Sequence, residues 1–222
     1  MPEPDQPRFD QPRFGAALNT DLYELTMAAG YFEAGKAQDR ATFELFVRRL
    51  PWNRNFVLAA GLAQAVDYLL NLRFTAAEIA YLKTLPQFEH TQSGFFDMLS
   101  RLRFTGDLFA VREGIPLFAG EPFLTVRAPL IEAQLIETYL LATIGFQSTI
   151  ATKAARVVRA ALGHSVVEFG TRRAHSPEAG VLAARAASTP ASGECARRVP
   201  NSITEWPRAA LTTRAAFVAI VD

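Results

Sequence analysis

The sequence is poor in cysteine, in net charge and in long apolar runs, and each shortage argues against a class of protein. Cys195 is the single cysteine among 222 residues, so no disulfide can form within the chain. Disulfide-free chains are typical of reducing compartments, and we expect a cytoplasmic protein. The 23 basic and 22 acidic residues nearly cancel, without the basic excess of a nucleic-acid binder. The most apolar stretch, residues 130–150, contains two glutamates and two glutamines, which is too polar for a membrane span of about 20 residues.

The composition is that of a folded globular chain. Half of the residues are apolar and a fifth are charged, which suits a buried core and argues against intrinsic disorder. At roughly 150 residues per domain, the length corresponds to about one and a half domains. The N-terminus has no basic region followed by an apolar run, so it is not a signal peptide. We expect a flexible leader at 1–17, an α/β region at 18–129, helices and a first βα unit at 130–187, and a poorly ordered tail at 188–222.

Apolar periodicity predicts a mixture of helices and short strands in the first region. Strict alternation over residues 41–48 predicts a strand. The capping-box spacing of Thr75-Ala-Ala-Glu78 predicts the start of a helix that runs to Leu85. Further helices are expected at 58–72 and 95–102, and short strands separated by tight turns within 107–126.

The second region is predicted to be mainly helical. Residues 130–162 have a helical pattern that Gly145 interrupts, so we expect two helices that meet near this glycine. The apolar run 165–169 predicts a strand, and residues 177–187 predict a helix. A strand, a loop and a helix form a βα unit, and ligands bind at the carboxyl ends of strands in such units.

The composition changes abruptly near residue 188. Residues 1–187 contain 23 leucines, whereas residues 188–222 contain only Leu211. Three prolines follow the break in the helical pattern: Pro190, Pro200 and Pro207. A reading-frame shift produces a change of this kind, so we expect the chain to be truncated or frameshifted after about Ala187.

The segment after the predicted strand contains the side chains best suited to binding an anion. Phe169 can stack on a flat heteroaromatic ring, and Gly170 allows a ligand to approach the backbone closely. Arg172 and Arg173 can grip a carboxylate or a phosphate with their planar guanidinium groups. The segment suits an aromatic anion, a phosphorylated ligand, or both. The alternative is that the arginines are surface charges and Phe169 belongs to the core.

Two other segments are weaker candidates. Residues 19–31 contain Tyr23 in a helical pattern, and the alternative there is a buried tyrosine on an amphipathic helix. Lys153 and Arg156 lie three residues apart on one helical face and would suit a diphosphate, although a solvated basic face is the commoner explanation. Glu113 and Glu121 flank turns and are interpreted as turn residues.

Several familiar site motifs are missing from the sequence. The three histidines are scattered without metal-ligand spacing, so no metal site is expected. The sequence contains neither of the glycine-rich patterns that bind dinucleotides and nucleoside triphosphates.

A series of short motifs follows one another along residues 18–187. The motifs are Thr20-Asp-Leu-Tyr-Glu-Leu-Thr-Met27, Phe46-Val-Arg-Arg-Leu-Pro51, Ala60-Gly-Leu62, Glu113-Gly, Gly120-Glu-Pro122, Glu132-Ala-Gln-Leu-Ile-Glu137, Ile150-Ala-Thr-Lys-Ala-Ala-Arg156 and Glu168-Phe-Gly-Thr-Arg-Arg173. No single motif is decisive, but their joint order is highly specific, and in this order they resemble nicotinate phosphoribosyltransferase.

The resemblance implies a fold and an activity. The fold would be an N-terminal α/β region packed against an irregular α/β barrel, of which this chain has the beginning. The activity would be phosphoribosyl transfer from phosphoribosyl pyrophosphate to nicotinate, helped by ATP hydrolysis, in the salvage route to NAD. Mg²⁺ would accompany the phosphoribosyl pyrophosphate and ATP, and no tightly bound organic cofactor is implied.

The resemblance also implies roles for individual residues in a homodimer. Tyr23 would stack on nicotinate from the neighbouring subunit and Phe169 from the home subunit. The two arginines would face the nicotinate carboxylate and the phosphoribosyl group, in an order left open. The implied substrate-binding residues are Tyr23, Phe169, Gly170, Thr171, Arg172 and Arg173, and the candidate phosphate ligands are Lys153, Arg156 and His175.

The sequence departs from the family pattern in two places. Gly145 stands where the family pattern leads us to expect an asparagine. Residues 188–222 contain neither the Gly-Thr-Ser-Asn-like loop nor the histidine that ATP phosphorylates, so no catalytic residue is assigned. The alternative hypothesis is therefore an inactive fragment or pseudoenzyme of this family that acts at most as an interaction subunit.

Overall fold

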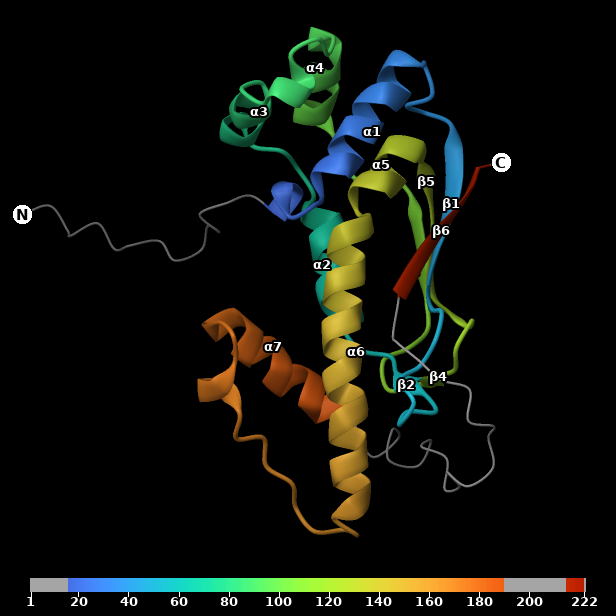
Figure 1. Cartoon of the computed structure of the whole chain (residues 1–222), viewed down its shortest axis with the longest axis vertical. Coiled ribbons are helices and arrows are strands. Elements are labelled where there is room, and N and C mark those ends of the chain that lie inside the picture. The colour runs from blue at the N-terminus through green and yellow to red at the C-terminus, as the bar shows by residue number, and fades with distance from the viewer. Residues whose placement is uncertain (1–15, 190–214, 222) are drawn as a thin grey trace, which may run out of the picture.

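A four-stranded antiparallel sheet forms one side of the molecule, beside a long helix (Figure 1). The computed structural model describes residues 16–189 and 215–221. The expected leader, 1–17, lies outside the described residues except at its end. The strands are ordered β3 (Asp107–Ala110), β5 (Pro122–Pro129), β1 (Arg40–Val47) and β6 (Ala215–Val221). A separate pair joins β2 (Val57–Leu58) to β4 (Pro116–Leu117).

Alternation of side chains explains the central strand of the sheet. Phe43 and Leu45 of β1 are buried, and their partners on β5 are Val126 and Leu124. A bulge follows Leu45, where the register with β5 shifts by one residue. The prediction of a strand over 41–48 is confirmed.

Helices cover one end of the sheet. α1 (Leu22–Glu33) packs against α5 (Leu130–Leu135), and α5 in turn contacts β1 and β5. Thr75 begins α3 with a capping box, in which the Thr75 amide donates to Glu78 Oε2 at 2.7 Å. The capping box was predicted and is confirmed. The remaining elements of this region are the helices η1 (Ala16–Leu18), α2 (Leu62–Asn71), α3 (Ala76–Leu82), η2 (Pro86–Phe88) and α4 (Ser93–Arg101).

The long helical region breaks earlier than predicted. α5 ends at Leu135, and α6 (Glu137–Ala160) begins after Ile136 and runs straight through Gly145. The expected break at Gly145 is therefore wrong. A glycine costs a helix only about 1 kcal/mol, and Ile144 and Gln147 on either side are buried against the rest of the protein. Their tertiary contacts outweigh the local preference.

The region after α6 contains η3 (Thr171–Arg173) and α7 (Pro177–Ser188). Residues 164–170 form no strand, so the predicted strand over 165–169 is wrong, and no barrel is evident in the described residues. An isolated extended segment is not a strand until another strand pairs with it, and none of the described strands does so. Of the expected tail, β6 pairs with β1, while residues 190–214 and 222 lie outside the description. None of the described helices combines the length and apolar character needed to cross a membrane.

Candidate functional site

A tight turn presents the predicted anion-binding segment. The Gly170 amide donates to Glu168 Oε1 at 2.5 Å, and the Thr171 hydroxyl donates to Glu168 Oε2 at 3.2 Å. The Arg173 amide closes the turn by donating to the Gly170 carbonyl at 2.8 Å. The Glu168 carboxylate therefore stabilises the turn by accepting hydrogen bonds from the next few residues. Helix η3 begins at Thr171, within this turn.

The turn displays an aromatic ring and a guanidinium group together. Phe169 is 73% exposed, so the alternative in which it belongs to the core is wrong. Arg172 lies over its ring, with 4.8 Å between the guanidinium carbon and the ring centroid. Both Arg172 and Arg173 are exposed. An exposed ring beside two cations is an arrangement that can bind a flat anion through stacking and charge.

Helix α7 holds η3 in place. A methyl group at Gly180 would lie 2.8 Å from Thr171 Cγ2 and 3.2 Å from the Thr171 carbonyl oxygen, so only glycine permits this close packing. The Ser176 hydroxyl caps α7 by accepting from the Ala179 amide at 3.1 Å. The turn at residues 168–173 thus packs on the first turn of α7.

A charged network anchors the other end of α7. Arg185 Nη2 donates to Glu113 Oε2 at 2.9 Å, and its Nη1 donates to Gln147 Oε1 of α6 at 2.7 Å. Glu113 Oε1 also accepts from the amides of Gly61 and Leu62, at 2.8 and 2.7 Å, at the start of α2. One carboxylate therefore ties together α2, α7 and the turn before β4.

The sequence pattern predicted Glu113 as a turn residue and did not predict its structural role. It does lie in a turn, but its carboxylate serves residues distant in sequence. The Glu113-Gly pair among the motifs of the family resemblance was the signal that could have identified it. No sequence motif pointed to a role for Arg185.

The network continues along the interface between α2 and α6. The Gln147 side-chain amide donates to Gln64 Oε1 at 2.6 Å, and the Gln64 amide donates to the Tyr139 hydroxyl at 3.2 Å. The Tyr139 ring stacks on Tyr68 with 3.6 Å between centroids. Burial raises the pKa of Tyr68, whose hydroxyl has no hydrogen-bond partner among the described residues.

Tyr23 lies on a second polar cluster, at the start of α1. Its side chain is 47% exposed, so the alternative of a buried tyrosine is wrong. Its hydroxyl lies near Glu24 and Glu137; partial burial first, and then these two carboxylates, raise its pKa. Tyr23 is therefore held as a neutral phenol with part of its ring open to solvent.

The carboxylate of Glu24 is fully buried beneath Tyr23. It accepts from the Thr138 amide at 3.1 Å and hydroxyl at 2.7 Å at the start of α6, and it is hydrogen-bonded to the Thr20 hydroxyl. Burial is the main cause that raises its pKa to about 7, and Glu137 adds to the effect while the bonds from Thr138 oppose it. This carboxylate fixes the start of α1 on α6.

A single chain does not bring Tyr23 and Phe169 together. α1 lies at the upper end of the molecule in Figure 1, while the segment that precedes α7 lies at the lower left. Their joint action on one ligand would require a second chain, as the resemblance implies.

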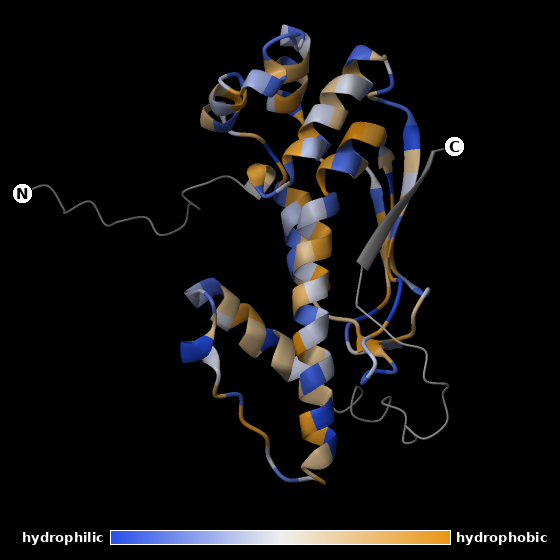
Figure 2. Ribbon diagram, viewed as in Figure 1, coloured by the Kyte–Doolittle hydropathy of each residue, from blue (hydrophilic) through white to orange (hydrophobic). Residues whose placement is uncertain are grey.

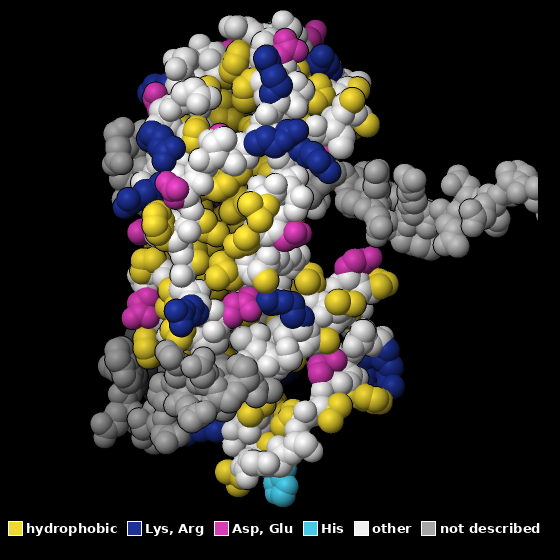
Figure 3. All heavy atoms as spheres, turned by 180° about the vertical axis from the view of Figure 1, so that it is seen from behind, with side chains coloured by type: hydrophobic (Ala, Val, Ile, Leu, Met, Phe, Trp, Pro, Cys, Tyr) yellow, Lys and Arg dark blue, Asp and Glu magenta, His cyan; other side chains and the backbone are white. Residues whose placement is uncertain are grey.

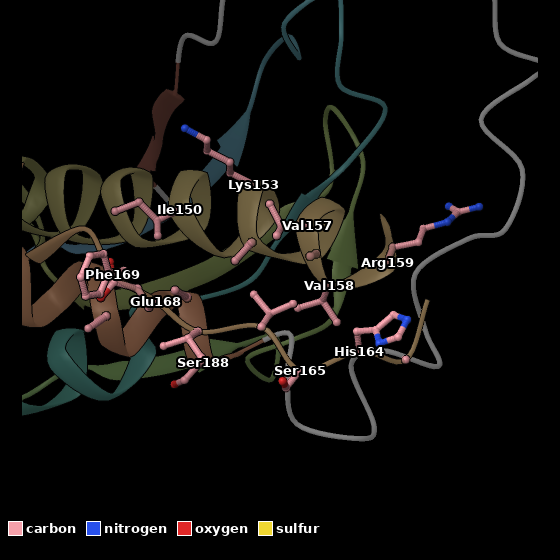
Figure 4. A pocket seen from close by; sticks show the side chains of 17 residues that line it. Ile150, Lys153, Val157, Val158, Arg159, His164, Ser165, Glu168, Phe169 and Ser188 are labelled. Carbon is pink, nitrogen blue, oxygen red and sulfur yellow. The ribbon is translucent and has the colours of Figure 1, made fainter. Parts of the chain in front are cut away.

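The three candidate phosphate ligands lie on two elements. Lys153 and Arg156 are exposed on α6, and Arg156 Nη1 donates to the Asn53 carbonyl at 3.3 Å. His175 is exposed in the loop between η3 and α7. Figure 4 shows the Lys153 side chain directed away from the space between α6 and residues 164–169. Lys153 and Arg156 thus lie three residues apart on one helix, as predicted, and their role as phosphate ligands stays a prediction.

The charges at the turn of residues 168–173 would suit an anion and not a bare metal ion. Both oxygens of Glu168 already accept hydrogen bonds, and the neighbouring charges on η3 are positive. No group of three or more histidine, cysteine, aspartate or glutamate side chains in the described part could hold a metal. Mg²⁺ at this site would be bound by the phosphate oxygens of a substrate, and no protein ligand is assigned to it.

Comparison with known proteins identifies the class. A family model described as the N-terminal domain of nicotinate phosphoribosyltransferase matches residues 18–145. Nicotinate phosphoribosyltransferase pncB2 of Mycobacterium tuberculosis is 48% identical over 169 residues, which are 76% of this chain and 36% of that protein. The Bacillus subtilis enzyme is 45% identical over 172 residues, 77% of this chain and 34% of that protein. The chain belongs to the nicotinate phosphoribosyltransferase family, and the resemblance found in the sequence is confirmed.

Solved structures show the same fold. The chain is similar to human nicotinic acid phosphoribosyltransferase, with a TM-score of 0.69 and 38% identity over 84% of this chain and 39% of that one. Nicotinate-nucleotide pyrophosphorylase from Pyrococcus furiosus shares the fold, with a TM-score of 0.56 at 20% identity over 81% of this chain and 40% of that one. The chain spans about a third of the length of the curated relatives that it matches.

Proposed function

We propose that this protein contributes to phosphoribosyl transfer from phosphoribosyl pyrophosphate to nicotinate, with ATP hydrolysis, in the salvage route to NAD. Family membership supports the reaction class, and the pairing of Phe169 with Arg172 on a fixed turn is the single observation that supports the binding site. Nicotinate is a flat aromatic carboxylate. An exposed ring and two guanidinium groups match both of its features.

The proposed roles follow from the geometry of the turn. Phe169 stacks on the pyridine ring, and one of Arg172 and Arg173 binds its carboxylate while the other faces the phosphoribosyl group. Arg172 already lies over the Phe169 ring, so its guanidinium moves toward the ligand carboxylate when the pyridine takes its place on the ring. Gly170 and Thr171 contribute through the backbone of the turn that Glu168 holds.

The chemistry needs positioned cations and no side-chain nucleophile. As the bond between the anomeric carbon and diphosphate breaks, positive charge develops on the sugar and negative charge on the leaving group. The protein must hold the two reactants in line and neutralise the diphosphate. Arginines of the turn supply part of that charge, and Mg²⁺ carried by the diphosphate supplies more.

A homodimer completes the proposed site. Tyr23 of the neighbouring subunit stacks on the face of the pyridine that Phe169 leaves open. Tyr23 suits this role because it is partly exposed and its hydroxyl is held by the carboxylates at the junction of α1 and α6. The Glu24–Thr138 contact fixes the helix that presents it.

The second candidate function is that of a non-catalytic interaction subunit. The solvent exposure of the turn favours this non-catalytic role, because Phe169, Arg172 and Arg173 are all exposed in the described part of the chain. A phosphoribosyl site excludes water, and a misplacement of about 1 Å can cost roughly 100-fold in rate.

Assays of nicotinate mononucleotide formation test separately whether this chain is active alone and whether the assigned residues serve the family reaction. We expect the 222-residue chain, given nicotinate, phosphoribosyl pyrophosphate, ATP and Mg²⁺, to form no product above background. In a full-length version of the protein, Arg172→Ala and Arg173→Ala should each lower activity at least tenfold, and at least one should raise the KM for nicotinate. Arg101→Ala, an exposed arginine at the end of α4, is the control. Unchanged kinetics in both arginine variants would exclude the assigned site.

A further inference from the structure

A single hydroxyl joins two carboxyl groups at the junction of α1 and α6, where both helices carry hydrophilic residues among hydrophobic ones (Figure 2). Thr138 Oγ1 lies 2.7 Å from Glu24 Oε1 and 2.9 Å from Asp21 Oδ2. Both are hydrogen-bond distances between oxygen atoms. The hydroxyl has one hydrogen, so it can donate to only one of the two carboxyl groups. The other contact requires a proton on a carboxyl group, which then donates to Thr138 Oγ1.

Burial identifies Glu24 as the group that holds this proton. The Glu24 side chain is fully buried, whereas Asp21 is exposed and its carboxylate remains in contact with water. An ionised carboxylate is costly to bury, and burial raises the pKa of Glu24 to about 7 although the bonds from Thr138 oppose the change. The arrangement is therefore a protonated Glu24 that donates to Thr138, which in turn donates to the Asp21 carboxylate.

The helices around Glu24 offer no positive charge that could replace the proton. The titratable groups on the helices packed here are Asp21 and Tyr23 at the start of α1, Glu132 on α5, Glu137 and Tyr139 on α6, and Tyr68 on α2. Helices α1, α2 and α5 contain no basic residue, and the first on α6 is Lys153, in the second half of that helix. The acidic side chains visible in Figure 3 are scattered, and several lie beside lysine or arginine side chains. Loss of the proton from Glu24 thus leaves like charges together, without a neighbouring cation.

Tyr23 lies directly on this group of carboxyls. Its hydroxyl donates to Glu24 Oε1 at 3.4 Å, and Glu137 lies close enough to raise its pKa further. Tyr23 and Glu24 are neighbours in the first turn of α1, so a shift of that turn carries the Tyr23 ring with it. The later turns of α1 are held separately, by the buried Ala28 and Ala29. The start of the helix can therefore move while the rest stays packed.

We propose that Glu24 is a positioning residue for Tyr23, and that the proton it shares with Asp21 through the Thr138 hydroxyl holds the start of α1 on α6. Release of the proton lets the first turn of α1 move away from the other carboxylates, and the Tyr23 ring moves with it. The consequence for nicotinate binding rests on the proposed role of Tyr23. The shared proton and the movement do not.

Nuclear magnetic resonance of the 222-residue chain tests the proton and the movement together. The protein is labelled with ¹³C at the glutamate carboxyl carbons and at the tyrosine ring carbon that bears the hydroxyl, and Glu24→Gln and Tyr23→Phe assign the two signals. We expect the Glu24 and Tyr23 signals to titrate with one common midpoint near pH 7. A Glu24 signal that titrates near the usual 4.5 would overturn the proposal, as would a Tyr23 signal that does not follow Glu24.

A conservative variant separates positioning from a general effect of pH. The amide of Glu24→Gln is neutral at every pH and can still donate to Thr138 Oγ1, so the Tyr23 signal should keep its low-pH position between pH 5 and pH 9. Glu33→Gln is the control, because Glu33 is exposed at the far end of the same helix, and its Tyr23 signal should titrate as in the wild type. A Tyr23 signal that titrates equally in all three proteins would contradict the assignment to Glu24.

Kinetics test the consequence for the substrate separately. In a version extended to the length of its relatives, the KM for nicotinate should rise about threefold or more between pH 6 and pH 8.5, relative to Glu24→Gln over the same range. A KM ratio that is flat with pH, found together with the common titration of Glu24 and Tyr23, would contradict the proposed role of Tyr23 and leave the positioning by Glu24 standing. The absence of the common titration would overturn the positioning itself, whatever the kinetics.

Discussion

Arg185 on α7 and Glu113 before β4 are joined through Nη2, which lies 3.0 Å from one carboxylate oxygen and 2.9 Å from the other. The same carboxylate accepts two backbone amides at the start of α2. The contact therefore fixes helix α7, on which η3 packs, to the N-terminal region of the protein. Both side chains are partly buried, with 35% of Arg185 and 25% of Glu113 exposed, so solvent screens the pair less than a fully exposed ion pair.

Removing this carboxylate should destabilise the fold. We expect Glu113→Ala to lower the free energy of unfolding by about 2–3 kcal/mol, because it leaves two amides and a guanidinium without their acceptor. Arg40→Ala is the matched control, since Arg40 lies 3.7 Å from Asp107 in a pair that is more than half exposed. Its loss should cost less than about 1 kcal/mol. Urea unfolding followed by circular dichroism measures both, and equal effects would contradict the role of Glu113.

Two helical glycines should respond oppositely to alanine. Gly180→Ala would place a methyl group 2.8 Å from Thr171 Cγ2, so η3 must move away from α7 and stability should fall by about 1–3 kcal/mol. Gly145→Ala meets no atom within 4 Å and lies inside α6, so it should stabilise the protein by about 0.5–1 kcal/mol. Thermal unfolding of the two variants decides the matter. A stabilised Gly180→Ala protein would mean that η3 does not pack on α7 as described.

Local patterns and distant contacts differ in how well the sequence predicted them. The strand over 41–48 and the capping box at Thr75 were predicted, because each depends on neighbours within a few residues. The prediction of a helix break at Gly145 was wrong, because burial of the flanking residues outweighs a glycine penalty of about 1 kcal/mol. The prediction of a strand over residues 165–169 was wrong, because a strand needs a second strand to pair with, and a local sequence pattern does not reveal whether one is present.

In the candidate site, too, local features were predicted from the sequence and contacts between distant residues were not. The segment from Phe169 to Arg173 was predicted to present its side chains together, and it does so because its residues are adjacent in sequence; its role in binding stays a prediction. The Glu113–Arg185 pair was not predicted, because its members are 72 residues apart and only the packing of α7 on α6 brings them together. Lys153 and Arg156 were predicted to share one helical face and both lie exposed on α6, while His175, the third candidate phosphate ligand, lies between η3 and α7.

The buried carboxylate of Glu24 should make stability depend on pH. Its pKa rises from the usual 4.5 to about 7 in the folded protein, chiefly because of burial. The folded state therefore retains a proton that the unfolded state loses between these values. The contribution of Glu24 to the free energy of unfolding is therefore greatest below about pH 4.5. It falls as the pH rises to about 7 and is constant above that pH.

Replacing Glu24 isolates its share of that dependence. Glu132 and Glu137 also have raised pKa values through burial, so the wild-type slope has several sources. Glu24→Gln should flatten the fall in unfolding free energy between pH 5 and pH 7.5, whereas Glu33→Gln, at an exposed position on the same helix, should leave the slope unchanged. Urea titrations at the two pH values provide the comparison. A slope that persists in full in Glu24→Gln would show that the carboxylate is ionised throughout.

The proposed site requires Tyr23 and Phe169 from different subunits, and mixed dimers of a version extended to the length of its relatives test this requirement. We expect Tyr23→Ala and Phe169→Ala each to abolish most of the activity, since each removes one face of the nicotinate sandwich. In a mixed dimer, both substitutions fall in one of the two sites and the other site is intact. Random mixing of the inactive variants should therefore restore activity to about a quarter of wild type, because half of the dimers are mixed and half of their sites are complete. Mixing either variant with a Tyr23→Ala, Phe169→Ala double variant is the control, and it should restore nothing. Activity that stays at background in the first mixture, measured as nicotinate mononucleotide formed after the subunits have exchanged, would place both residues in the same subunit's site.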